Sequence, residues 1–328
     1  MISTIAVVGL GQMGTSYTRH ASTIADKVIC FDYDENQRAT FKDRIQSFHN
    51  PFDGLNECNV NTETIRIVDD LDLVWKYDPD LTIITTHKDS HCFYSCLAMK
   101  NNSHVLTEKP LCMNLEEAKK IQAISSQLEK KVFIGFSLHA TPAFIKLKEH
   151  LSVNKKGKIK LYQVYRIGAV PEDYMDSVSV RFDLLSHDTD FCLQLFKFPQ
   201  HTRVNEVDAR SCNKLWQYDG FEVEMIGRMP ITHPNGFEYG YKLIYQDGNY
   251  LEFSSKQSNS LFMKNVRNNI IDIIPLEITS PCKMILEKSV NSIIKDSYEC
   301  YLNHELSILK GVNCMAMLSH DHKSGIDD

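Results

Sequence analysis

Three glycines near the start of the chain have the spacing of a phosphate-binding turn. Gly9, Gly11 and Gly14 follow a β-branched run at 2–8 and precede a helix-compatible stretch at 15–25. The first glycine permits a tight turn, the second lets the backbone approach a pyrophosphate, and the third lets the helix pack against the strand. Free N–H groups and the dipole at the start of such a helix favour anions. Because the chain has only 14 glycines, roughly 0.03 chance matches to this pattern are expected, and the alternative is an ordinary glycine turn without a ligand.

A carboxylate follows the turn at the distance expected for a ribose ligand. Asp32 ends the second apolar run and lies 18 residues after Gly14, close to the ~20 at which an acid binds the adenosine ribose. It would repel the 2′-phosphate of NADP, and the next residue is Tyr33 rather than an arginine, so the pattern predicts NAD in preference to NADP. Arg38 is the one nearby residue that argues the other way, and a solvated turn at 32–36 is the structural alternative.

Three side chains further along the chain are suited to proton transfer. Histidine exchanges a proton near neutral pH, and a lysine desolvated beside a cofactor can share that proton. Asp183 and His187 are four residues apart, so on a helix they occupy one face and the carboxylate can orient the imidazole. Lys109 stands between Glu108 and Pro110 at the end of a strand pattern. The alternatives are an exposed or capping Asp-His pair and a surface lysine at a strand end.

The elements that must position these residues alternate between strand and helix patterns. Apolar runs predict strands at 2–8, 27–31, 81–86, 104–107 and 132–135, with helices at 15–25, 70–75, 90–100 and 115–129. Asn114 and Glu117 form a capping-box pattern before the last helix. In a doubly wound sheet, ligands lie beyond the carboxyl ends of the strands, so one rim is expected to carry Thr85, Thr86, His87, Glu108, Lys109 and Ser137.

The pattern changes after about Phe136. A helix at 141–151, a strand at 157–167 and a helix at 182–196 precede mostly alternating strands from 205 to 278, with a hairpin signal at 246–249. We therefore expect an α/β protein with an N-terminal Rossmann doubly wound parallel sheet and a C-terminal α/β domain with a large, mostly antiparallel open sheet. We place a dinucleotide-binding domain at 1–122 and a substrate-binding and oligomerisation domain at 123–328.

Composition and charge exclude several classes of protein. With 43% apolar and 24% charged residues in 328 positions, the chain has ordinary globular composition and a length typical of two domains. The net charge is −6 and the basic residues cluster only at 155–158, so we expect no nucleic-acid partner. No apolar run approaches the roughly 18 residues of a membrane span and no signal-peptide pattern opens the chain, so we expect no membrane segment and a cytoplasmic protein.

The spacing of cysteine and histidine does not predict a metal site. The ten cysteines are scattered without a C-x-x-C pair, several in apolar stretches such as 28–31, and are expected to be core residues in a reducing compartment. His87, His91 and His104 fall on a strand end, a helix start and the next strand, with no carboxylate at ligand spacing. We therefore expect no metal.

Three motifs in this order resemble the Gfo/Idh/MocA family of glucose-fructose oxidoreductases, inositol dehydrogenases and rhizopine-catabolism proteins. They are Ile5 to Gly14, Glu108-Lys109-Pro110 and Asp183-x-x-x-His187. The resemblance covers nearly the whole chain and implies a Rossmann domain followed by an α/β domain whose open sheet commonly packs against another subunit. It implies an NAD-dependent dehydrogenase that acts on CH–OH carbons of a sugar, nucleotide sugar or cyclitol, in a homodimer or homotetramer.

The resemblance also assigns site residues. Gly9, Gly11, Gln12, Met13 and Gly14 would meet the pyrophosphate, Asp32 the ribose, and Thr86, His91 and Glu108 the nicotinamide side. Lys109, Asp183 and His187 match the family's catalytic residues. We hypothesise that His187 is the general acid/base, that Lys109 polarises the reacting hydroxyl, and that Asp183 orients both. These three would also bind the substrate, together with His139 and Arg166.

Two positions depart from the family pattern and leave the substrate open. His139 stands where many members have an arginine or asparagine, and the segment 177–182 lacks the family's glycine pair. The final residues 324–328 form a segment that in relatives usually introduces a last helix, so we expect that this helix is absent or that the sequence is truncated.

Two other functions are compatible with the sequence. A non-enzymatic NAD-binding regulatory or interaction protein would keep the glycine turn and lose the acid/base, and the joint presence of Lys109, Asp183 and His187 argues against it. NAD-assisted hydrolysis or elimination would return a tightly held cofactor to its starting state in each cycle. The sequence does not separate that reaction from net dehydrogenation.

Overall fold

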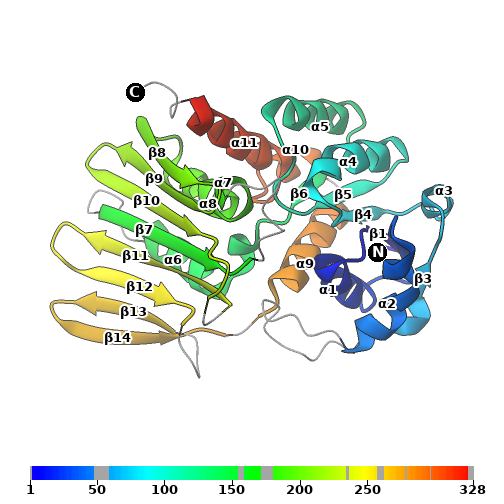
Figure 1. The fold of residues 1–328 in the computed structure, drawn as a ribbon, viewed down its shortest axis with the longest axis horizontal. Coiled ribbons are helices and arrows are strands. Elements are labelled where there is room, and N and C mark those ends of the chain that lie inside the picture. The colour runs from blue at the N-terminus through cyan, green and yellow to red at the C-terminus, as the bar shows by residue number, and fades with distance from the viewer. Residues whose placement is uncertain are drawn as a thin grey trace. The chain divides into compact units, whose positions relative to one another are not determined.

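The structure is a computed structural model that describes residues 2–47, 59–153, 159–170, 180–233, 236–256, 262–277, 279–295 and 297–323. The chain forms two compact units, residues 1–140 with 279–315 and residues 141–278 with 316–328 (Figure 1). The basic cluster at 155–158, the first half of the 177–182 segment and the final residues 324–328 lie outside the described residues.

The first unit contains a six-stranded sheet in which neighbouring strands are parallel, with the order β3-β2-β1-β4-β5-β6. Its strands are β1 (Thr4–Val8), β2 (Lys27–Phe31), β3 (Ile65–Ile67), β4 (Leu81–Ile84), β5 (His104–Thr107) and β6 (Val132–Ile134). β1, β4 and β6 are buried at every position, as expected for a parallel sheet covered on both faces. The predicted Rossmann sheet is therefore confirmed, although β4 ends two residues before the predicted strand does.

The helices of this unit cover both faces of the sheet. They are α1 (Gln12–Ala21), α2 (Glu35–Ser47), α3 (Leu71–Trp75), α4 (His91–Lys100), α5 (Leu115–Gln127), α9 (Pro281–Ile294) and α10 (Tyr298–Leu302), with short 3₁₀ turns η1 (Thr62–Thr64), η2 (Lys88–Ser90) and η3 (Ser137–Ala140). The strand order reverses direction between β1 and β4, so right-handed connections place α1 and α2 on one face and α4 and α5 on the other. α9 packs against α1.

The capping box predicted before α5 is present in the structure. The Asn114 side-chain oxygen accepts a hydrogen bond from the Glu117 backbone N–H at 2.9 Å. The Glu117 carboxylate accepts one from the Met113 N–H at 3.1 Å. These contacts satisfy backbone donors at the start of the helix and fix where it begins.

The boundary between the units differs from the predicted one. The units divide at 140/141 rather than at 122/123. The predicted boundary falls inside α5 and before β6. The segment 279–315, which the prediction places in the second domain at 123–328, returns to the first unit. The Ile134 N–H of β6 donates to the Leu306 carbonyl at 2.9 Å, and the Tyr301 hydroxyl bonds both the N–H and the carbonyl of Val132. This segment therefore covers the edge of β6, which would otherwise present unpaired backbone groups.

The second unit contains an eight-stranded sheet with the order β14-β13-β12-β11-β7-β10-β9-β8. Its strands are β7 (Ile159–Gly168), β8 (His201–Asp208), β9 (Ser211–Tyr218), β10 (Phe221–Arg228), β11 (Phe237–Tyr245), β12 (Tyr250–Ser254), β13 (Phe262–Arg267) and β14 (Ile270–Pro275). The β7–β10 pair is parallel and the other pairs are antiparallel. The hairpin at 246–249 joins β11 to β12, with Gly248 at a positive φ of 84°. The predicted mostly antiparallel sheet and the predicted hairpin are both confirmed.

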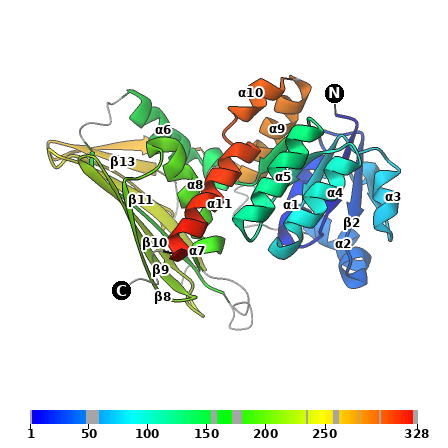
Figure 2. The same cartoon turned by 90° about the horizontal axis from the view of Figure 1, so that it is seen from above.

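One face of this sheet is covered by helices. α6 (Pro142–Val153), α7 (Val180–Asp183) and α8 (Leu185–Phe196) lie on the same side of the sheet (Figure 2). The single helix predicted at 182–196 is interrupted at Leu184. Within the described ranges, no helix covers the other face. A last helix, α11 (Ile308–Lys323), begins in the first unit and ends in the second.

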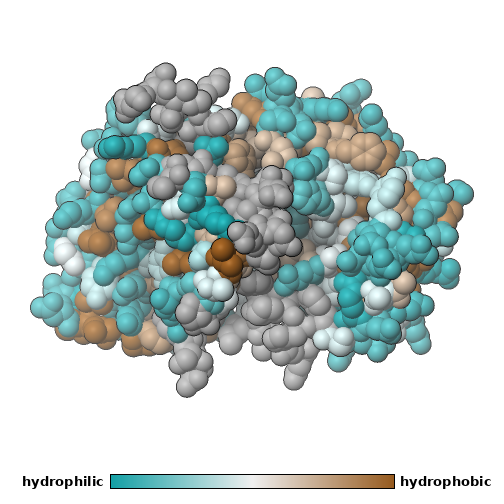
Figure 3. Space-filling view, in the orientation of Figure 1, coloured by the Kyte–Doolittle hydropathy of each residue, from teal (hydrophilic) through white to brown (hydrophobic). Residues whose placement is uncertain are grey.

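The molecular surface in the view of Figure 3 is mainly hydrophilic, with scattered apolar residues. Exposed isoleucines mark the edge strand β14, at Ile270, Ile271 and Ile273. No helix among the described residues is long and apolar enough to cross a membrane. Nine of the ten cysteines lie in the described part of the chain, and eight of these are buried, as predicted, whereas Cys300 is exposed.

Candidate active site

The turn after β1 has a backbone geometry that requires two of its three glycines. Gly9 has a positive φ of 98°, and a Cβ there would lie 2.7 Å from the Thr85 backbone. A Cβ on Gly14 would lie 1.9 Å from the Gly9 carbonyl oxygen. A Cβ on Gly11 would meet no atom within 4 Å. Gly9 and Gly14 are therefore needed for the fold itself, whereas Gly11 leaves open space beside the backbone, as an approaching pyrophosphate requires.

The start of α1 is available to an anion. Gly11 is the N-cap residue and has no side chain to accept a hydrogen bond from the first turn, which begins at Gln12 and Met13. The first N–H groups of a helix have no partner within the helix and attract negative charge. The glycine turn therefore fits the diphosphate of a dinucleotide.

Asp32 ties the second strand end to the glycine turn. Its carboxylate accepts hydrogen bonds from the Leu10 N–H at 2.6 Å and from the Asp34 N–H at 2.9 Å. Each oxygen retains a further lone pair, so both can still accept from ribose hydroxyls. Beside it, the Tyr33 side chain is 78% exposed and its ring makes an edge-to-face contact with the Phe31 ring at 5.7 Å.

Two arginines of α2 contact the same region. Arg44 Nη2 donates to the Leu10 carbonyl at 2.9 Å, inside the glycine turn. Arg38 Nη1 donates to the carbonyls of Asp32 and Tyr33 at 2.7 and 3.0 Å. Sequence reasoning missed Arg44, because it lies 34 positions from Leu10 and no local pattern connects them. Both guanidinium groups add positive charge near the predicted pyrophosphate and ribose positions.

His91 connects the strand ends at the predicted nicotinamide side. Its Nδ1 lies 2.7 Å from the Pro110 carbonyl and its Nε2 lies 3.1 Å from the Thr86 carbonyl. Burial lowers the pKa of the imidazole, against the opposing effect of these two carbonyls. A neutral imidazole has one N–H, so the shorter contact identifies the Pro110 carbonyl as its main acceptor. The Ser90 hydroxyl donates to Thr86 Oγ1 at 2.7 Å and fixes that side chain.

Glu108 and Lys109 form a compact turn at the end of β5. The buried Glu108 carboxylate accepts a hydrogen bond from the Lys109 N–H at 3.1 Å. A Cβ at Gly135 would lie 2.8 Å from Glu108 Oε1, so glycine at this position makes room for the carboxylate. The Lys109 side chain is half-buried. The rim predicted from the strand ends is thus assembled within the first unit.

Asp183 and His187 lie in the second unit on either side of the interruption at Leu184. Asp183 is half-buried at the end of α7, and His187 is 9% exposed in the first turn of α8. Leu184 retains helical dihedral angles, φ −86° and ψ −54°, so the two side chains remain about one turn apart. The predicted common face is preserved despite the interruption.

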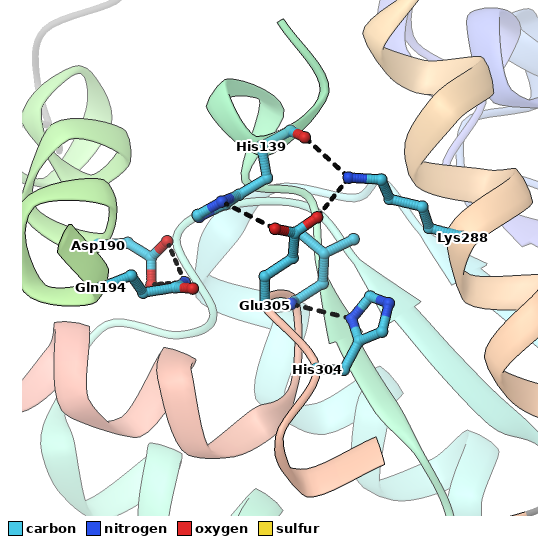
Figure 4. A network of polar contacts seen from close by, with 7 residues as sticks. His139, Asp190, Gln194, Lys288, His304 and Glu305 are labelled. Carbon is cyan, nitrogen blue, oxygen red and sulfur yellow. Dashed lines mark hydrogen bonds and ion pairs between the residues drawn. The ribbon is translucent and has the colours of Figure 1, made fainter. Parts of the chain in front are cut away.

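His139 belongs to a network within the first unit that the sequence did not reveal (Figure 4). Its Nδ1 lies 3.6 Å from the Glu305 carboxylate, and its carbonyl accepts a hydrogen bond from Lys288 Nζ at 2.8 Å. Lys288 also pairs with Glu305. The carboxylate and the ammonium come from the returning segment 279–315, so this arrangement depends on the tertiary fold. The predicted role of His139 in substrate binding stays a prediction.

Arg166 occupies a buried position on β7. Its Nε donates to the Asp188 carboxylate at 2.6 Å, and its guanidinium lies over the Tyr239 ring at 5.5 Å. Its predicted contact with substrate also stays a prediction. Among the described residues, no group of three or more His, Cys, Asp or Glu side chains is arranged to hold a metal ion.

Comparison with known proteins gives the same class of fold. The family described as "Oxidoreductase family, NAD-binding Rossmann fold" matches residues 3–136. The chain is 25% identical over 214 residues to the uncharacterized oxidoreductase YhhX of Escherichia coli, covering 62% of this chain and 61% of that protein. It is 23% identical over 213 residues to myo-inositol 2-dehydrogenase of Thermotoga maritima, covering 62% of this chain and 57% of that enzyme. The matches thus span less than two thirds of these relatives.

A solved structure of similar fold extends over the whole chain. UDP-N-acetylglucosamine 3-dehydrogenase from Acidithiobacillus ferrooxidans gives a TM-score of 0.79 at 17% identity, covering 99% of this chain and 98% of that chain. At this identity the likeness shows the fold alone. The fold and the glycine turn of residues 3–136 are those of an NAD-binding Rossmann domain of an oxidoreductase family. Residues 3–136 match the Gfo/Idh/MocA family, the family that the sequence motifs resemble.

Proposed function

We propose that this protein is an NAD-dependent dehydrogenase that transfers a hydride between a CH–OH carbon of a sugar, nucleotide sugar or cyclitol and nicotinamide. The glycine turn carries the proposal, because Gly11 leaves open space at an uncapped helix start while Asp32 is fixed beside it. The related myo-inositol dehydrogenase and the structurally similar UDP-N-acetylglucosamine dehydrogenase support this substrate class.

The residues of the first unit would hold the cofactor. Gly9 to Gly14 and the start of α1 fit the diphosphate, and Asp32 fits the ribose hydroxyls. A carboxylate at this position disfavours a 2′-phosphate, so we propose NAD rather than NADP. Thr86, His91 and Glu108 surround the carboxyl ends of β4 and β5, where the nicotinamide would lie.

The remaining chemistry is proton transfer. Nicotinamide supplies or accepts the hydride when bound, and a protein group must supply or remove the proton of the reacting hydroxyl. His187 would act as general acid/base, Lys109 would polarise and position the hydroxyl, and Asp183 would orient these groups. In a site shielded from water, the hydrogen bonds and charge interactions of these three side chains with the reacting hydroxyl are stronger than in bulk solvent.

Nicotinamide fluorescence tests the cofactor assignment. Purified protein, first shown to carry no cofactor, is titrated with NADH and separately with NADPH, and the titrations are repeated with Asp32→Ala. Asp34→Ala is the matched control, because this carboxylate caps the same turn through the Asn36 N–H and has no predicted ribose contact. Preferential NADH binding that Asp32→Ala weakens and Asp34→Ala preserves would support the proposal. If neither NADH nor NADPH binds, the proposal is overturned.

A substrate screen tests the reaction itself. The protein is incubated with NAD and a panel of sugars, sugar phosphates, nucleotide sugars and cyclitols, and NADH release is followed by absorbance. Net NADH formation supports dehydrogenation. Product formation without NADH in solution would instead indicate NAD-assisted hydrolysis or elimination, in which the cofactor returns to its starting state.

We also propose that the second unit forms a homodimer or homotetramer through the uncovered sheet face. Strand register places Leu161, Ile244, Tyr250, Val266 and Ile271 in one row across five strands of this face. In the neighbouring row, charges of alternating sign at Glu224, Lys242, Glu252 and Lys264 stand in this order across the sheet, with the neutral Gln163 between the first two. An apolar row beside alternating charges is self-complementary, and such a face is a liability when left in water.

Light scattering during size-exclusion chromatography tests this assembly. A dimer or tetramer is expected, and Ile244→Lys should convert it to smaller species because it places a charge in the apolar row. Ile231→Lys is the control, since that exposed isoleucine lies outside the strands of the sheet. A monomeric unaltered protein would rule the assembly out.

A further inference from the structure

A cluster of buried charges lies between α8 and the sheet of the second unit. Arg166 on β7 is 4% exposed, Lys214 on β9 is 0% exposed, and Asp188 on α8 is 1% exposed. Arg166 Nε donates to the Asp188 carboxylate at 2.6 Å, and Lys214 Nζ donates to Thr189 Oγ1 at 3.0 Å. Two consecutive residues of α8 are therefore held by two cations of the sheet.

Stability alone does not account for this cluster. Removing charges from water is costly, and apolar residues of similar volume often give equal or greater stability than a buried ion pair. Burial raises the pKa of Asp188, and the positive charges of Arg166 and Lys214 oppose that effect. A hydrogen-bonded ion pair differs from an apolar contact in being directional, and here the direction is set by the single hydrogen bond from Arg166 Nε to Asp188 Oδ2.

The pair fixes one side of α8 at the turn that carries His187. The N-cap residue Leu184 provides no side-chain hydrogen bond, so the start of α8 is not held by a cap. Asp188 immediately follows His187 along the helix. Successive residues are separated by about 100° around a helix axis, so the rotation that places Asp188 on Arg166 also sets the direction of His187.

The cation is itself held in one orientation. The Arg166 guanidinium lies 5.5 Å from the centre of the Tyr239 ring, on the strand next to β7. Tyr239 in turn stacks on Phe144 of α6. The Arg166 side chain therefore cannot follow a rotation of α8 without breaking contacts with the sheet.

We propose that the Arg166–Asp188 ion pair, supported by Lys214, is a positioning device that sets the rotation of α8 and thereby aims the His187 imidazole. Arg166 then acts through His187 instead of touching substrate. The inference depends on the proposed function only for the consequence on catalysis, because the direction of His187 is measurable without substrate.

The test compares Arg166→Lys, which keeps the charge and loses the planar fork, with the double variant Arg166→Met/Asp188→Leu, which replaces the pair by apolar groups. Single removal of either charge leaves the other buried, whereas the double variant removes both and leaves Lys214 with its hydrogen bond to Thr189, so the double variant is the one expected to fold. Lys146→Met is the control, since it removes one cation from an exposed ion pair on α6. Thermal unfolding, the imidazole proton resonances and steady-state kinetics are measured for each. The His187 resonance is identified by its loss in His187→Gln.

The expected result is a changed His187 resonance in both pair variants, with kcat lowered about 10- to 100-fold and the KM for NAD within about twofold. The double variant should show this even when its unfolding temperature matches the unaltered protein. If the double variant matches the unaltered protein in stability and also in its His187 resonance and kcat, the inference is overturned. The pair would then be a structural contact only. If His187→Gln itself leaves turnover unchanged, the proposed acid/base fails, whereas the resonance still decides whether the pair aims the imidazole.

Discussion

At the scale of single residues, the predicted cofactor groups are held by backbone atoms. The Asp32 carboxylate accepts from the Leu10 N–H, and the Glu108 carboxylate accepts from the Lys109 N–H. His91 contacts two backbone carbonyls. These contacts need no ligand, so the side chains are organised before a cofactor binds, which reduces the entropy that binding must overcome.

Replacing His187 tests the proposed acid/base. His187→Ala should lower kcat on the order of 100-fold or more, because general acid/base groups contribute at least that much, while NADH affinity stays within about twofold. Stopped-flow hydride transfer and fluorescence titration measure the two quantities. His201→Ala, at an exposed position of β8, should change neither. An equal loss of turnover and NADH affinity would contradict the assignment.

At the scale of elements, neighbouring strand ends of the first sheet are connected in succession. Asp32 joins the end of β2 to the turn after β1, and the Thr85 hydroxyl joins the segment after β4 to the Gly9 carbonyl at 2.7 Å. His91 joins the segments after β4 and β5. The rim is therefore a set of loops connected by hydrogen bonds.

The three glycines of the turn should respond differently to alanine. Gly14→Ala should lower the free energy of unfolding by about 3 kcal/mol, because its Cβ would overlap the Gly9 carbonyl. Gly11→Ala should remain within about 1 kcal/mol of the unaltered protein and still weaken NADH binding, since its Cβ enters open space at the diphosphate position. Urea unfolding and NADH titration measure these effects. Unchanged NADH affinity in Gly11→Ala would place the diphosphate elsewhere.

His91 should make the stability of the first unit depend on pH. Its pKa is lowered in the folded protein, mainly by burial, whereas an unfolded histidine titrates near 6.5. Below about pH 6.5 the unfolded chain takes up a proton that the folded chain does not, so stability is lost as the pH falls until the folded pKa is reached. Urea unfolding between pH 8 and pH 5.5 should show a smaller loss in His91→Gln than in the unaltered protein or in the exposed-site control His201→Gln. Equal slopes in all three proteins would contradict this.

At the scale of the whole molecule, the chain leaves the first unit at 140 and returns to it at 279. The returning segment supplies α9, α10 and the hydrogen bonds that cover the edge of β6. It also supplies Lys288 and Glu305 to the network around His139. The first unit is therefore completed only after the second unit has been synthesised.

Replacing Tyr301 tests how much the segment 279–315 contributes to the free energy of unfolding. Tyr301→Phe removes a hydroxyl that bonds the Val132 N–H at 2.7 Å and the Val132 carbonyl at 2.6 Å, in a fully buried position. We expect a loss of about 2 kcal/mol in the free energy of unfolding, because these two groups and the Ile308 N–H, which also donates to this hydroxyl, lose a buried partner. Tyr298→Phe, which removes a single contact with Ser125, is the control and should cost less. Equal effects in urea unfolding would show that the edge contact is unimportant.

Local sequence determined the parts of this protein in which neighbours along the chain decide the structure. The glycine turn, Asp32, the Asn114 cap and the hairpin at 246–249 depend on backbone dihedral angles and capping atoms within a few residues, so their patterns are visible in one dimension. The tertiary structure decided the return of 279–315, the contact of Arg44 with Leu10, and the pairing of Arg166 with Asp188. These contacts join residues far apart in sequence, and they form only when strand register and helix packing bring the partners together, which no local pattern encodes.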